Sequence, residues 1–445
     1  MIEKHEMQPI VSIALPLMTA LLAQRGMQFI DTVMMGWLGP TALAAGAMGT
    51  SLFVTTILFC TGVLSAIGIF IVRAKGSDNL TDIKFIMQHG FCLALLLSIP
   101  CMLIIWFIPY ILLSLSENQL VVKETVLLLH GMVWGLPGFL LFLVLREYIA
   151  AFALTRVVMM VSLFSIPLTF VANYILIYGK YNFPKLGIAG IGYGGTAVMW
   201  FMFLCLLVYS IKHPVLRKHI VLQPFKFNHI TFRDMLHIGI PSGALFLLEA
   251  GMFLSTTIMM GYFGVAALAA HQIALQCVNI VYTLAVALSM ATALQIGHAV
   301  GVKNPAQVQR TALLSFSIAL LLSAIIAIIF ICATNFLVSL FLEKGANNFK
   351  EVYKLATAFI KIAAFFLCFD AMQSVANGAL RGLKDTFVPM LLSIGCYWVL
   401  GIGGAYYLSM YTSLNADGIW YGLTLGLCST AIILVLRFCR KLTNM

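Results

Sequence analysis

Twelve long apolar stretches run along the chain, and they restrict its possible folds more than any other feature. A helix needs about 20 predominantly apolar residues to cross the hydrocarbon core of a bilayer, and each stretch is long enough. Within lipid, an α-helix satisfies all of its backbone hydrogen bonds internally. The sequence therefore predicts twelve membrane-spanning helices. They lie near residues 10–37, 43–72, 86–115, 122–145, 157–178, 187–211, 235–262, 266–297, 311–342, 352–379, 386–409 and 416–438.

The composition leads to the same class of protein. Of the 445 residues, 62% are hydrophobic and 9% are charged, whereas soluble domains carry roughly 25% charged residues. A soluble chain of this length would lack the polar side chains to cover its surface. We therefore expect an all-α integral membrane protein. The first span lacks the small-residue cleavage site of a signal peptide, so we expect it to be retained.

The positive charges indicate how the chain is inserted. In a soluble protein a net charge of +11 would suggest nucleic-acid binding, but here the basic residues cluster between the spans. One set of span ends carries eighteen Lys and Arg residues and the other set carries six. The positive-inside rule then predicts a multi-pass protein of the cell membrane with both termini in the cytoplasm.

The second half of the chain repeats the first. At an offset of 225 residues, the segment 34–45 matches the segment 259–270, and at an offset of 228 residues 190–194 matches 418–422. Each half holds six spans, an even number, so the halves share one orientation and are related by an axis along the membrane normal. This predicts two six-helix lobes with pseudo-two-fold symmetry. The lobes are 1–215 and 234–445, joined by a cytoplasmic linker at 216–233.

Two lobes of this kind are typical of alternating-access transporters, which bind substrate in a cavity between the lobes. The sequence contains no Gly-x-x-x-x-Gly-Lys-Ser/Thr motif and no evident catalytic or metal-ligand cluster. Gly190–Gly195 formally matches G-x-G-x-x-G, but it opens a membrane helix rather than following a strand. We therefore expect a transporter that is not an enzyme and has no cofactor.

Three acidic residues lie within spans: Asp31, Glu249 and Asp370. A charge at membrane depth costs about 2.5–3.5 kcal/mol even on the insertion scale, so such acids usually have a function. A buried carboxyl group readily takes up a proton, and a carboxylate is also an oxygen ligand for sodium. The alternative is a purely structural role, as a hydrogen-bonded acid or in an ion pair such as Asp31 with Arg25.

Helical spacing places other polar groups beside these acids. Gln24, Gln28 and Asp31 share one face of the first helix, and the repeat puts Glu249 and Phe253 on the corresponding face of the seventh. In the tenth helix, Asp370 shares a face with the amides of Gln373 and Asn377. Further polar residues within spans can instead form ordinary helix–helix hydrogen bonds. These further residues are Asn173, Ser51, Gln272, Gln276, Asn279 and Tyr282.

Several motifs together resemble those of multidrug and toxin extrusion (MATE) transporters. The resemblance covers essentially the whole chain, and its first-half signature is Phe29–Gly39 followed by Ala42–Ala45. The second-half signatures are Pro241–Gly243 with Glu249, Ala269–Gln272 and Asn377–Thr386.

The acid pair Glu249 and Asp370 resembles the NorM branch of this family. The resemblance implies a cation site, expected to bind sodium, at these two acids, with Phe253 and Tyr282 as aromatic neighbours. In the DinF-like branch, coupling centres on the first-helix Asp, an Asn and a second Asp. Here Asp31 and Asn173 are present, but Ile177 replaces that second Asp. A complete DinF-type proton site is therefore not expected, although proton binding at Asp31 is not excluded.

The resulting prediction is a monomeric antiporter that exchanges Na⁺, H⁺ or both for amphipathic, often cationic drugs. The predicted substrate-binding residues are Gln24, Gln28, Asp31, Ser51 and Gln272. Two alternatives stay open: a flippase for lipid-linked precursors of the same superfamily, and a membrane scaffold without transport activity. A flippase should line its cavity with several basic residues, but only Arg25 and Lys361 fall within the predicted spans.

Overall fold

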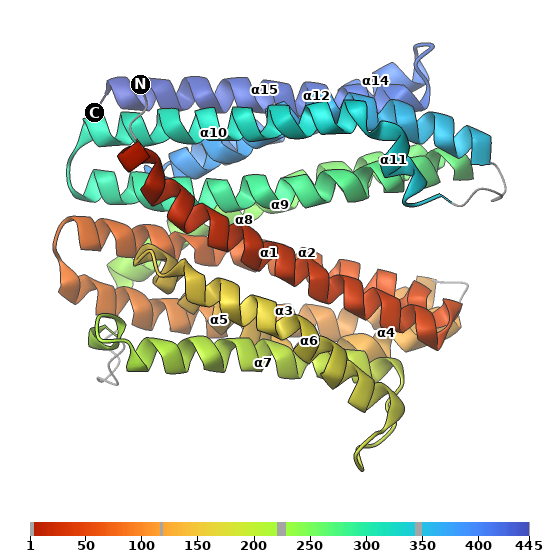
Figure 1. Ribbon diagram of the computed structural model, residues 1–445, viewed down its shortest axis with the longest axis horizontal. Coiled ribbons are helices and arrows are strands. Elements are labelled where there is room, and N and C mark those ends of the chain that lie inside the picture. The colour runs from red at the N-terminus through yellow and green to blue at the C-terminus, as the bar shows by residue number, and fades with distance from the viewer. Residues whose placement is uncertain (1–3, 116–118, 220–227, 343–348, 445) are drawn as a thin grey trace. The chain divides into compact units, whose positions relative to one another are not determined.

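A computed structural model describes residues 4–115, 119–219, 228–342 and 349–444 (Figure 1). Over these residues the regular secondary structure is entirely helical, and twelve segments are long and apolar enough to cross a membrane. The predicted fold class is therefore confirmed. The helices are α1 Lys4–Leu38, α2 Pro40–Gly76, α3 Leu80–Leu115, α4 Gln119–Met132, η1 Val133–Gly135, α5 Leu136–Ala151, α6 Thr155–Tyr178, α7 Ile188–Lys212, η2 Leu216–Lys218, α8 His229–Gly261, α9 Val265–Gly301, α10 Pro305–Cys332, α11 Thr334–Ser339, α12 Phe349–Gly382, α13 Phe387–Ile394, η3 Gly395–Ile402, α14 Gly403–Met410 and α15 Ala416–Thr443.

Three of the spans differ from continuous α-helices. The ninth was expected over 311–342, but α10 ends at Cys332 and the short helix α11 follows. The hydroxyl of Thr334 donates to carbonyl oxygens of the last turn of α10, at Phe330 and Ile331. The fourth span joins α4 to α5 through a 3₁₀ turn, and the eleventh joins α13 to α14 through the π-helical segment η3. Such π segments often occur at functional sites.

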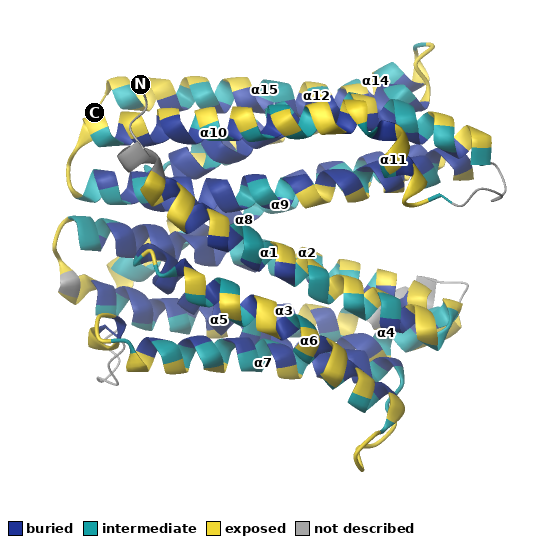
Figure 2. Ribbon diagram, in the orientation of Figure 1, coloured by how far each residue is buried: buried dark blue, intermediate teal, exposed yellow. Residues whose placement is uncertain are grey.

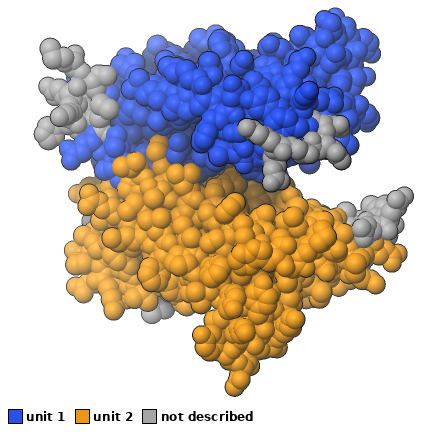
Figure 3. All heavy atoms as spheres, turned by 45° about the vertical axis from the view of Figure 1, so that its right-hand side comes forward, with its two compact units in different colours: residues 1–14, 244–445 blue, residues 15–243 orange. Residues whose placement is uncertain are grey.

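The chain forms two compact units, coloured separately in Figure 3. We call residues 15–243 the N-terminal unit and residues 1–14 with 244–445 the C-terminal unit. These units differ from the predicted lobes at the first helix of each half, because α1 and α8 each contribute residues to both units. Of the predicted linker, 216–233, residues 220–227 lie outside the described part of the chain.

Each unit has its own arrangement of packed helices. In the C-terminal unit, α12 packs along α9, α10 and α15. Its core contains Trp420, whose ring lies 5.9 Å from Phe359 and 6.0 Å from Phe366, measured between centroids. In the N-terminal unit, α7 packs against α4, α5 and α6, while α2 contacts α3, α4 and α5.

The glycines of the repeated motif have the same packing role in both units. A Cβ atom at Gly190 would lie 2.7 Å from the backbone of Leu176, and one at Gly418 would lie 2.6 Å from the backbone of Leu408. Only glycine permits this close approach between the fifth and sixth helices of each half. Small residues at helix contacts are typical of membrane bundles, where backbones pack closely.

Exposed residues run along the helices of both units (Figure 2), and many of them are large and apolar. Phe164, Leu254 and Leu313 are examples, each more than 60% exposed. Contiguous apolar surface of this kind is unfavourable in water, but it matches a hydrocarbon environment. The surface therefore agrees with a multi-pass membrane protein.

Candidate functional site

Two of the three predicted acids meet inside the C-terminal unit. Glu249 lies on α8 and Asp370 on α12, and both are buried. The side-chain amide of Gln373, one turn after Asp370 on α12, bridges them. Its Nε2 donates to Glu249 Oε1 at 2.9 Å and to Asp370 Oδ1 at 3.3 Å. Residues separated by more than 120 positions in the sequence therefore form one polar site.

A second layer of side chains completes this site. The hydroxyl of Tyr282, on α9, donates to Glu249 Oε2 at 3.2 Å. The Oε1 atom of Gln373 accepts from the Tyr397 hydroxyl at 2.6 Å and from Asn377 Nδ2 at 3.3 Å. We call these six residues the acid–amide network: Glu249, Tyr282, Asp370, Gln373, Asn377 and Tyr397.

The network is suited to binding a small cation. Two buried carboxylates repel each other, and holding both charges away from water is unfavourable without a proton or a metal cation. The carboxylates, the tyrosine hydroxyls and the amide carbonyls are oxygen donors, the type that hard cations prefer. Among the described residues, no three His, Cys, Asp or Glu side chains come together as a metal cluster. The available chemistry is therefore that of a proton or an alkali cation shared by two acids.

Phe253, expected to be an aromatic neighbour of the ion, lies one turn beyond Glu249 on α8. Its ring packs edge-on against Phe366, with centroids 6.1 Å apart, at the border of the apolar core. A direct role for this ring at the ion stays a prediction, whereas Tyr282 contacts Glu249 as described above.

The third predicted acid, Asp31, lies on α1 in the N-terminal unit. Its Oδ1 accepts a hydrogen bond of 2.7 Å from Asn173 Nδ2 on α6. Asn173 is fully buried, and a Cβ atom at Gly194 would come within 2.2 Å of its Oδ1. The glycine of α7 therefore makes room for the asparagine that holds Asp31. Ile177, one turn beyond Asn173, is buried and offers no acid.

The predicted drug-binding residues are divided between the units. Gln24, Gln28 and Ser51 lie on α1 and α2 in the N-terminal unit, and Gln272 lies on α9 in the C-terminal unit. Gln28 Oε1 accepts from Arg25 at 3.2 Å. The Nε2 atom of Gln24 is buried and has no hydrogen-bond partner among the described residues. The drug-binding role of this set stays a prediction.

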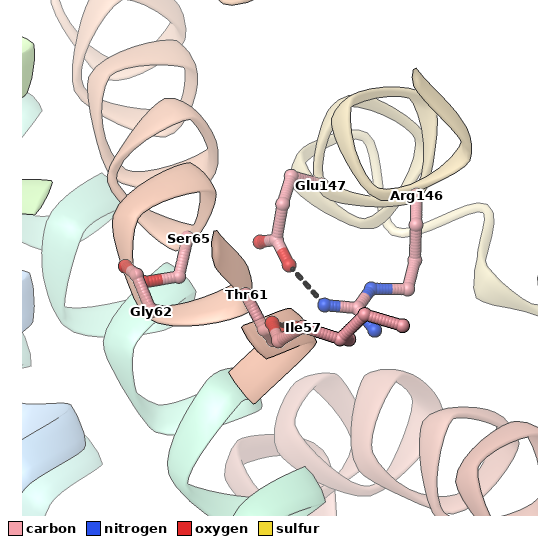
Figure 4. Close-up of polar contacts among 6 residues, drawn as sticks. All are labelled: Ile57, Thr61, Gly62, Ser65, Arg146 and Glu147. Carbon is pink, nitrogen blue, oxygen red and sulfur yellow. Dashed lines mark hydrogen bonds and ion pairs between the residues drawn. The ribbon is translucent and has the colours of Figure 1, made fainter. Parts of the chain in front are cut away.

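Sequence reasoning missed a buried ion pair in the N-terminal unit. Arg146 Nη2 donates to Glu147 Oε1 at 2.9 Å, and both side chains are 3% exposed. Figure 4 shows the two side chains near the part of α2 that carries Thr61 and Ser65. Both residues fall just beyond the predicted fourth span, 122–145, so the predicted spans did not indicate that they are buried.

Tyr397 was missed as well. It is fully buried, whereas the three residues that follow it in η3 are exposed. Tyr397 shares a helix face with the buried residues Pro389 and Ser393, so the helical period agrees with its burial. The period does not show which side chain of another helix this tyrosine meets.

The comparisons with known proteins agree on one family. The MatE family profile matches residues 16–175 and 241–407. A probable multidrug resistance protein NorM from Pseudomonas aeruginosa is 34% identical over 434 residues, covering 97% of this chain and 89% of the relative. A protein of the same name from a Synechocystis species is 32% identical, covering 97% and 94% respectively.

Solved structures share the fold. The eukaryotic MATE transporter AtDTX14 superposes with a TM-score of 0.86 at 21% identity, covering 99% of this chain and 98% of that one. A transporter of the MOP superfamily from Pyrococcus furiosus superposes with a TM-score of 0.89 at 18% identity, covering 98% and 96%. At these identities the similarity establishes the fold alone.

Proposed function

The chain belongs to the MatE family of multidrug transporters, and from this premise we propose that it exchanges cations for amphipathic drugs by alternating access. Members of this family are transporters, so the expectation that the chain is not an enzyme is confirmed. The bridge from Glu249 through Gln373 to Asp370 is the observation that carries the proposal.

Coupling requires that ion and drug favour different conformations or compete for shared groups, so that the ion shifts the populations of outward and inward states. One amide joins the two acids, and the Tyr282 hydroxyl donates to Oε2 of Glu249. The net charge of this site changes when a cation binds. We propose sodium as the coupling ion, with protons able to occupy the same acids. The oxygen-rich environment supports sodium, as does Ile177 in place of a second acid near Asp31.

Drug binding is proposed for polar residues outside the acid–amide network. These residues are Gln24, Gln28, Asp31, Ser51 and Gln272. A site with few carboxylates and much aromatic and Met surface suits loose recognition of flat, lipophilic cations. We further propose that the protein acts as a monomer in the cell membrane, with both termini in the cytoplasm.

The test is transport in proteoliposomes, with a sodium gradient and a pH gradient imposed separately. We expect a sodium gradient to drive ethidium export by the wild type. Glu249→Gln and Asp370→Asn should abolish this ion-driven export, because each removes one of the two bridged carboxylates. Asp31→Asn should instead change drug affinity or the response to protons.

Two outcomes would contradict the proposal. Export driven only by the pH gradient, and lost only in Asp31→Asn, would move the coupling site to the N-terminal unit. Translocation of a lipid-linked precursor in the same vesicles, with no export of cationic drugs, would favour the flippase alternative. The names of the relatives support drug export over that alternative.

A further inference from the structure

Every hydrogen-bonding position of the Gln373 amide is in use. The side chain of glutamine has two N–H donors and a carbonyl oxygen with two lone pairs. Both donors of Gln373 point to carboxylates, at Glu249 and Asp370, and its oxygen accepts from Tyr397 and Asn377. The amide therefore lies between the acids on one side and two neutral polar groups on the other.

In this orientation the amide nitrogen lies where the two carboxylates converge. An N–H group carries a partial positive charge and cannot ligate a metal ion, so this orientation opposes sodium binding. A protonated carboxyl group still has an oxygen that accepts from N–H, so the same orientation is compatible with protons on the acids. The arrangement is thus suited to the proton-loaded site but not to the sodium-loaded one.

We propose that Gln373 is a rotating ligand that distinguishes sodium from protons: half a turn of its amide exchanges Nε2 for Oε1 at the two acids. This inference rests on the proposed function of the acid–amide network. In the rotated state, Oε1 joins the carboxylates of Glu249 and Asp370 as a third oxygen ligand. The N–H groups then face Tyr397 and Asn377.

Tyr397 and Asn377 are able to hold the amide in both orientations. A tyrosine hydroxyl donates or accepts a hydrogen bond, so Tyr397 remains bonded when Gln373 turns its N–H toward it. The Oδ1 atom of Asn377 is buried and has no hydrogen-bond partner among the described residues. Because Asn377 Nδ2 faces Gln373 in this structure, the Asn377 amide must turn together with Gln373, and its Oδ1 then supplies the acceptor that the rotated amide needs.

Tyr397 lies within the π-helical segment η3. Its ring is fully buried, whereas Trp398, Val399 and Leu400 are each more than 40% exposed. Tyr397 touches neither acid through a hydrogen bond that the structure shows; it acts through Gln373. We therefore assign Tyr397 as a positioning residue and Gln373 as the ligand.

The test measures binding of radioactive sodium to the purified full-length protein, together with sodium-driven and pH-driven export. Gln373→Met keeps the length of the side chain but removes the oxygen, and sodium affinity should fall by about tenfold or more. Export driven by a pH gradient should fall less than export driven by a sodium gradient, because protons need no oxygen ligand from residue 373. Gln373→Glu supplies an oxygen without rotation and should bind sodium at alkaline pH at least as well as the wild type.

Tyr397→Phe removes one hydroxyl and should weaken sodium binding by several-fold, about the effect of one lost hydrogen bond. Tyr406→Phe is the matched control, since Tyr406 belongs to the same span but is half exposed; sodium binding should equal that of the wild type.

Different results would contradict the rotating-ligand inference and the proposed sodium coupling. Unchanged sodium affinity in both Gln373→Met and Tyr397→Phe, with loss in Glu249→Gln, would overturn the rotating-ligand inference and leave the coupling site intact. Equal loss of sodium-driven and pH-driven export in a correctly folded Gln373→Met would also overturn it. A wild type that neither binds sodium nor responds to a sodium gradient would overturn sodium coupling itself, whatever the variants do.

Discussion

The two units hold their membrane-embedded acids in different ways. In the C-terminal unit, Glu249 and Asp370 share one glutamine amide, whereas in the N-terminal unit the amide of Asn173 donates to Asp31 and to no second acid among the described residues. The glycines that bring the fifth and sixth helices together are nevertheless the same in both units. Duplication has thus preserved the residues that pack the helices, while the polar residues have diverged to give the units different binding chemistry.

Ion pairs differ between the units as well. Arg146 and Glu147 of the N-terminal unit are both 3% exposed. In the C-terminal unit, Arg437 binds Asp385 through two hydrogen bonds of 2.8 and 3.0 Å, but their side chains are 25% and 10% exposed. Solvent screens a charge that is left without a partner, so the two pairs should respond differently to the loss of one partner.

The largest expected effect on stability comes from breaking the buried pair. Arg146→Met leaves the Glu147 carboxylate buried without its counter-charge, and should lower the free energy of unfolding by about 3–5 kcal/mol. The double variant Arg146→Met with Glu147→Gln should recover much of this loss, because it removes both charges. Thermal unfolding of the purified protein in detergent measures both effects.

Arg437→Met is the comparison in the other unit. Its partner Asp385 keeps a second counter-charge, Lys441 Nζ at 3.8 Å, so the loss should be smaller, about 1 kcal/mol, and should shrink further in high salt. If Arg146→Met and Arg437→Met lowered the free energy of unfolding equally, the two pairs would contribute equally to stability despite their different burial.

The sequence predicted much of the scaffold, but only part of the site. Long apolar stretches identify spans because lipid forces the backbone into helices, and a carboxylate within a span is noticeable because it is costly. The bridging role of Gln373 depends on which helix faces meet, and a helical period alone does not determine that. Tyr397 was missed because the period does not show which side chain it meets, and Glu147 because the predicted fourth span ended at residue 145.

A smaller effect is expected from the glycine that adjoins the N-terminal acid site. Gly194→Ala would place a methyl group within 2.2 Å of Asn173 Oδ1. Asn173 must then move, which weakens its bond to Asp31, at a cost of about 1–3 kcal/mol. Drug affinity measured by fluorescence polarisation should change together with thermal stability. Gly195→Ala, where no atom lies within 4 Å of the added methyl group, should change neither.

The corresponding change in the C-terminal unit sharpens this comparison. A Cβ atom at Gly422 would lie 2.3 Å from the backbone of Ala405 rather than against a polar side chain. Gly422→Ala should therefore lower stability without a specific change in drug affinity. If Gly194→Ala destabilised the protein but left drug affinity unchanged, the contact between Asn173 and Asp31 would have no role in drug binding.

The smallest effect is expected from moving an acid between the units. Gln24 occupies the position in the first half that Glu249 occupies in the second. Adding Gln24→Glu to the Glu249→Gln variant restores the number of intramembrane acids, but only on α1 of the N-terminal unit. The fourth span of that unit carries buried apolar residues at 140–142, with no amide to bridge two acids. Sodium-driven export in proteoliposomes should therefore stay at the level of Glu249→Gln alone. Recovery of export would mean that the units are interchangeable for coupling, and that the arrangement of Gln373 between two acids is not required.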